Sequence, residues 1–74
     1  MTGITLRNRI NALFRAHLEK VTGEHVREVC LTSNAISIMG SRKAIDAVKE
    51  LPFTFANEEY DQEHDAWFIE IPIL

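Results

Sequence analysis

Carboxylates are the side chains of this chain whose type and spacing suggest chemistry. Five of them fall within eight residues, with no Lys or Arg nearby in the sequence to pair with them: Glu58, Glu59, Asp61, Glu63 and Asp65. A cluster of this kind can attract a basic surface, hold a cation or move a proton. It is also the composition of an ordinary solvated turn.

The cluster does not match a metal or catalytic motif. The run from Asp61 to Asp65 places oxygens at alternate positions but lacks the glycine and the distant glutamate of a calcium loop. The three histidines and Cys30 show no zinc-type spacing. No Gly-rich or apolar pocket is evident that would shift a carboxyl pKa for acid-base catalysis. We therefore expect no metal, no cofactor and no enzymatic activity.

Charge is unevenly distributed along the chain. Residues 1–49 hold all eight Lys and Arg and four of the acidic residues, whereas residues 50–74 hold the other seven acidic residues. The net charge of -3 conceals this division. Such asymmetry concerns partners and association rather than fold.

Two functions follow as hypotheses. The first is a small protein-binding module, an adaptor, inhibitor or accessory factor of the kind a phage or mobile element encodes. It would act by occupancy, through an acidic hairpin that meets a partner with a basic surface. Its predicted contact residues are Glu58, Glu59, Tyr60, Asp61, Glu63, Asp65 and Phe68.

The second hypothesis is a nucleic-acid-binding accessory protein. Arg7 and Arg15 lie on one side of a predicted helix, and Arg42 and Lys43 follow Gly40 at the start of another. Backbone N–H groups at a helix start and nearby cations can bind phosphate. The overall negative charge disfavours this alternative, and a glycine break before a capped helix is also an ordinary junction.

Length and composition favour one small domain over residues 1–74. A chain of 74 residues supports one core with little surplus, so a homodimer is an expectation. The single cysteine, Cys30, weakly favours a reducing compartment. No apolar run reaches the length of a membrane span, and the amphipathic N-terminus does not resemble a signal peptide. We therefore expect a cytoplasmic protein.

The elements that must position these residues follow from hydrophobic periodicity. Helices are predicted over 5–22, capped by Thr5 and ended by Gly23, and over 42–51, capped by Ser41 and stopped by Pro52. Strands are predicted over 24–31, 35–39, 53–56 and 67–73, and part of residues 57–65 is expected to extend the last two strands while the rest forms a polar hairpin tip. Because of Pro72, the last strand is expected at a sheet edge or with its final residues outside the ladder.

The predicted fold class is α+β, a two-layer sandwich of order α-β-β-α-β-β with both helices on one face of a four-stranded antiparallel sheet. Phe68 should point to the open face of this sheet, where Tyr60 and Met39 are candidates to join it. The predicted core comprises Leu6, Ile10, Leu13, Phe14, Leu18, Ile36, Ile38, Ile45, Val48, Phe53, Phe55, Trp67, Ile69 and Ile71.

Overall fold

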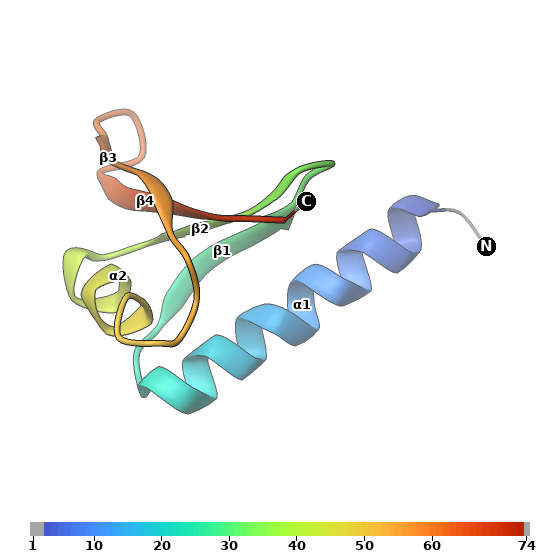
Figure 1. The fold of residues 1–74 in the computed structure, drawn as a ribbon, viewed down its shortest axis with the longest axis horizontal. Coiled ribbons are helices and arrows are strands. Elements are labelled where there is room, and N and C mark those ends of the chain that lie inside the picture. Colours follow the sequence, from blue (N-terminus) through green and yellow to red (C-terminus); the bar gives the residue numbers. More distant parts are fainter. Residues whose placement is uncertain (1–2, 74) are drawn as a thin grey trace.

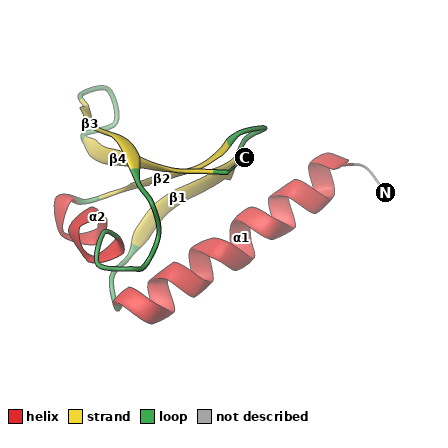
Figure 2. Ribbon diagram, viewed as in Figure 1, coloured by secondary structure: helices red, strands yellow, loops and turns green. Residues whose placement is uncertain are grey.

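The computed structural model describes residues 3–73, with side chains over residues 6–73. Its elements are α1 (Gly3–Thr22), β1 (Val26–Leu31), β2 (Ala35–Gly40), α2 (Arg42–Val48), β3 (Ala56–Asp61) and β4 (Ala66–Pro72) (Figure 1). The four strands form one antiparallel sheet in the order β1-β2-β4-β3. Both helices pack against this sheet (Figure 2), so the predicted α+β fold and its element order are confirmed.

Both helices differ from prediction at one end. Helix α1 begins at Gly3, so Thr5 lies inside it instead of capping it. Its other end is as predicted, because Gly23 has the positive φ of 72° that a left-handed C′ residue needs. Helix α2 ends at Val48, three residues before the predicted end, because the hydrogen bonds of the Glu50 and Leu51 N–H groups go to Ala47 and Val48, three residues back, and turn the chain out of the α-helix.

The central strands are β2 and β4, whose register pairs Ile38 with Ile69 and Met39 with Phe68. Of the two predicted consequences of Pro72, an edge position for the last strand is wrong, whereas the end of the chain does leave the ladder, because β4 stops at Pro72 and Ile73 lies outside it. Pro72 is the final residue of β4 and faces Ala35 at the end of the ladder, where a missing N–H does little harm. The edges are formed by β1 and β3.

The third predicted strand exists but begins later than expected, at Ala56 instead of Phe53. Phe53 and Phe55 lie in the loop before β3, with their rings 6.2 Å apart, and Phe53 also approaches Phe14 of α1 at 6.3 Å. The strand that pairs with β4 is the acidic segment Ala56–Asp61. An edge strand tolerates polar residues because much of it faces water, whereas the two aromatic rings pack against each other and, through Phe53, against Phe14.

The core lies between the sheet and the two helices. It is centred on Leu18, Val26, Val29, Ile38, Ile45, Val48, Ile69 and Ile71, with Phe14, Ile36, Leu51, Phe55 and Trp67 partly buried against it. Four predicted core residues are exposed instead: Leu6, Ile10, Leu13 and Phe53. Only the C-terminal half of α1 therefore contributes fully buried residues to this core, through Leu18.

The two sheet edges are treated differently. Helix α1 covers the edge formed by β1 and supplies acceptors for its backbone. Asn11 Oδ1 accepts from the Leu31 N–H at 2.8 Å, and Glu19 Oε2 accepts from the Val26 N–H at 2.9 Å. No described strand or helix caps the outer edge of β3 in this way. The β3 edge is thus the accessible one.

Candidate functional site

The acidic hairpin consists of β3, the turn that follows it and the start of β4. It projects at one end of the sheet, far from the N-terminus of α1 (Figure 1). Because side chains alternate along a strand, the sheet divides the predicted contact residues between its two faces. Glu59 faces Phe68 in the register, whereas Tyr60 faces Trp67.

Tyr60 and Glu58 lie on the helix side. The Tyr60 ring is 5.5 Å from that of Trp67, which packs against the core. Glu58 pairs with Lys49 after α2, at 2.7 Å. Tyr60 also borders the open face, because it lines the larger depression there together with Met39 and Phe68.

The opposite side of the sheet, which carries no helix, has an apolar centre and an acidic rim. Met39 and Phe68 form a cross-strand pair at its centre, and Phe68 points there as predicted. We call this surface the open face, and define it by Glu28, Met39, Glu59, Asp61, Phe68 and Glu70. Two depressions, of about 480 and 210 Å³, share Met39 and Phe68 as lining residues.

The charge of the open face is nearly uncompensated from within the sheet. Strands β2, β3 and β4 contain no Lys or Arg. The one cation of β1, Arg27, donates a hydrogen bond to the backbone carbonyl of His64 in the hairpin turn. Cys30 also belongs to this side of the sheet and is exposed.

The hairpin turn brings three possible cation ligands together. Ligand atoms of Asp61, Glu63 and His64 lie within 4.8 Å of one another. Asp61 Oδ2 is 2.7 Å from His64 Nδ1, and this contact is the main reason that the pKa of Asp61 falls below its ordinary value of 3.8. Nearby, the Tyr60 hydroxyl donates to Asp65, which raises the pKa of Tyr60. Two of the five clustered carboxylates, Asp61 and Asp65, are thus engaged in hydrogen bonds within the hairpin and stabilise its shape.

The four predicted nucleic-acid contacts fall on two helices. Near the start of α2, Arg42 pairs with Asp46 at 3.3 Å and lies over the Trp67 ring at 4.6 Å. Lys43 is 3.7 Å from Glu24. Ser41 caps α2 by accepting from the Ala44 N–H. These contacts give Arg42 and Lys43 structural partners, and nucleic-acid binding stays a prediction.

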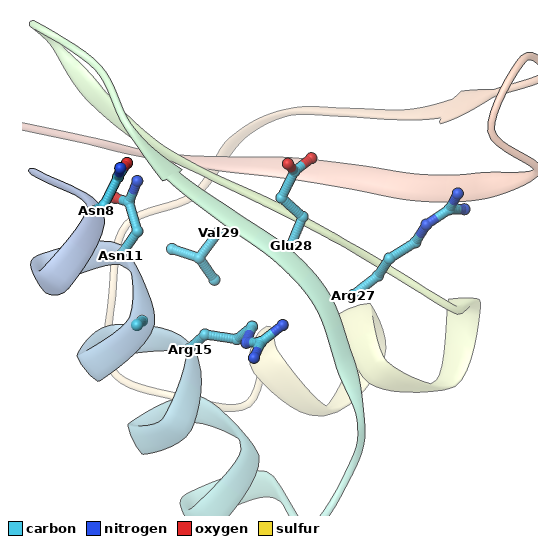
Figure 3. Close-up of a pocket in the computed structure, with 7 residues that line it drawn as sticks. Asn8, Asn11, Arg15, Arg27, Glu28 and Val29 are labelled. Atoms are coloured by element: carbon cyan, nitrogen blue, oxygen red, sulfur yellow. The ribbon is translucent and has the colours of Figure 1, made fainter. Parts of the chain in front are cut away.

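Arg15 belongs to a groove between α1 and β1. Figure 3 shows Asn8, Asn11 and Arg15 on the helix opposite Arg27, Glu28 and Val29 on the strand. The groove has a volume of about 270 Å³. Asn11 is engaged with the β1 backbone there, so the predicted stripe Arg7, Asn11, Arg15 is interrupted by a structural residue.

Sequence reasoning missed a second surface, because it assigned this surface to the core. Leu6, Ile10, Leu13 and Val21 of α1 are exposed by 50%, 41%, 64% and 47%. We call these four residues the α1 stripe. In a helix of 3.6 residues per turn they lie on one side, rotated by roughly 100° from Leu18, which faces the sheet. The sequence contained a signal for this exposure. The apolar and aromatic residues of α1 spread over a wider arc of the helix than a single contact with the sheet can bury.

Comparison with known protein families, curated proteins and solved structures gives no match for this chain. Within the described residues, neither helix has the length and apolar character needed to cross a bilayer. The functional argument therefore rests on the surfaces themselves.

Proposed function

We propose that this protein is a small binding module that acts by occupying another protein, and that the open face is its contact surface. The observation that carries the proposal is the combination of an apolar centre, Met39 and Phe68, with a rim of carboxylates on a sheet face that has no helix over it. Binding sites between proteins commonly place apolar residues at the centre and polar residues around them.

The chemistry of the rim defines the partner. Glu28, Glu59 and Glu70 would meet Lys or Arg of a partner, and exposed charges of this kind speed association and select partners more than they add affinity. A partner segment with one apolar side and basic flanks fits this surface. A reducing, cytoplasmic setting belongs to the same proposal, since the exposed thiol of Cys30 lies on this side of the sheet.

The face is a better candidate than the β3 edge. Pairing of an added strand requires a flat edge, but β3 carries a bulge and Asn57 has a positive φ of 55°. Its outward charges also oppose strand addition. These features hinder the pairing of another strand with the β3 edge, whereas the open face is free to contact a partner protein.

The test is capture of partners from a cell lysate with two charge-matched variants. The face variant carries Glu28→Gln, Glu59→Gln and Glu70→Gln. The control carries Glu24→Gln, Asp46→Asn and Glu50→Gln, which removes the same charge from other parts of the chain. We expect proteins retained by the unmodified chain to be lost with the face variant and kept with the control.

Equal loss with both variants would mean that only net charge matters, and retention by both would exclude the open face. Circular dichroism of each variant checks that the fold is preserved. A salt-dependent affinity for DNA or RNA that survives in the face variant would favour the nucleic-acid hypothesis instead.

A further inference from the structure

The α1 stripe is an apolar surface that stays exposed among the residues that the structure describes. Leu6, Ile10 and Leu13 follow the alternating spacing of four and three residues that lets a helix present a continuous seam. Leu13 is the most exposed of them, at 64%. Exposed apolar residues grouped in this way mark contact surfaces more often than isolated ones do.

Arg7, Arg9 and Lys20 flank this stripe on the helix, whereas Arg15 faces the groove beside β1. Helix α1 carries Arg7, Arg9, Arg15 and Lys20 against a single acidic residue, Glu19. Among the described residues none of these four cations forms an ion pair, and Glu19 pairs with His25. The stripe and the open face both have an apolar centre with charged residues around it. The charges around the stripe are basic, whereas those around the open face are acidic.

The two surfaces cannot meet within one chain. The acidic hairpin and the N-terminal half of α1 lie at opposite ends of the molecule (Figure 1). The open face also points away from the helix layer, which contains α1. Only a second molecule can bring a basic helix and an acidic face together.

Their dimensions agree. The stripe from Leu6 to Val21 extends about 22 Å at 1.5 Å per residue. Strands of six or seven residues, such as β2 and β4, extend about 20 to 23 Å. Three neighbouring strands span about 10 Å, close to the width of one helix. One α1 helix would thus cover the Met39–Phe68 centre.

We infer that the protein binds a second copy of itself, with the α1 stripe of one copy seated on the open face of the other. Charge complementarity between the basic helix and the acidic rim selects this arrangement over pairing of two α1 helices, which would bring like charges together. The inference rests on the proposed function, because it uses the same face, and it means that self-association and partner binding compete.

The proposed contact joins two different surfaces, so each surface can be damaged in a separate variant. Mixing the two variants then brings one intact helix surface together with one intact open face. In Leu13→Glu the helix surface is lost and the open face remains. In Glu59→Lys the face is damaged and the helix remains. Both residues are exposed, so neither change removes a core contact. Glu50→Lys, at an exposed position outside both surfaces, is the charge-matched control.

Sedimentation velocity of the full chain measures the outcome. We expect a reversible complex that weakens as salt rises, since salt screens the attraction. Leu13→Glu should weaken it by roughly tenfold or more, because a charge would be placed against the apolar centre. Glu59→Lys should weaken it less but clearly, and Glu50→Lys should behave like the unmodified chain. An equimolar mixture of Leu13→Glu and Glu59→Lys should restore a complex of one copy of each.

Three results would overturn the inference. A monomer at every concentration and salt would remove self-association. Loss of the complex in Leu13→Glu without any effect of Glu59→Lys would indicate pairing of two α1 helices. Failure of the mixture to restore a complex would exclude contact between unlike surfaces. In each case the capture experiment still tests the proposed function separately. If a captured protein is lost with the face variant and kept with the control, the proposed function holds even though self-association has failed.

Discussion

Truncation of two leucines in the same helix tests how α1 is attached to the domain. Leu18 is fully buried against the sheet, whereas Leu13, one and a half turns earlier, is 64% exposed. Sequence periodicity assigns both residues to the core. Leu18→Ala and Leu13→Ala are therefore chemically identical changes in environments that the structure distinguishes.

Their expected effects differ several-fold. Leu18→Ala removes buried methyl groups and leaves a cavity, which destabilises a core by about 3 to 5 kcal/mol. A domain of this length has a free energy of unfolding of roughly 4 to 11 kcal/mol, so this single change removes a large part of it. Leu13→Ala leaves no cavity, and alanine favours helix more than leucine does, so we expect a change within about 0.5 kcal/mol.

Urea denaturation followed by far-ultraviolet circular dichroism measures both values, at a protein concentration low enough to keep the chain monomeric. Equal destabilisation by the two changes under dilution would refute the reasoning, because it would place Leu13 in the core. A loss for Leu13→Ala that grows with protein concentration would instead report the association inferred above.

Three further predictions concern single positions. Hydrogen bonding to the Val26 N–H lowers the pKa of Glu19 from its ordinary 4.5, so its contribution to stability is present above pH 4.5 and lost as pH falls through the depressed pKa. Glu19→Gln should thus be less stable than the unmodified chain at neutral pH in a denaturation series, and the two curves should converge in acid. Gly23→Ala should cost about 1 to 2 kcal/mol by urea titration, because φ is 72° there and nothing within 4 Å would offset the strain. Trp67 fluorescence should be blue-shifted in the native state and move to the red in Arg42→Ala, which uncovers the ring; an emission already at the exposed position would contradict the register of β4.

The sequence predicted the architecture well because local signals agreed with one another. Alternation in Ile36 and Ile38 and the Gly40–Ser41 junction each mark an element or a boundary that the structure contains. The aromatic loop was mistaken for a strand because alternation of Phe53 and Phe55 looks the same in either state. Three-dimensional packing against Phe14, which no local pattern records, decided between them.

The sequence allows some residues of the candidate site to be placed on the correct face of the sheet, but not all of them. Phe68 was expected on the open face from its place opposite Trp67 and Ile69, and the register agrees. The register of β3 is not predictable in the same way, because a bulge between Ala56 and Glu59 changes which residues share a face and leaves no clear mark in composition. The exposure of the α1 stripe was missed because periodicity shows that a helix has an apolar side without showing whether the domain is large enough to cover it.

Amide chemical-shift mapping tests the central claim, that the open face is a protein-binding surface, most directly. The labelled full chain is titrated with the purified partner that the capture experiment returns. We expect the largest shifts on Met39, Glu59 and Phe68 and on their neighbours across the sheet. Shifts confined to α2 around Arg42 and Lys43, with the open face unchanged, would contradict it.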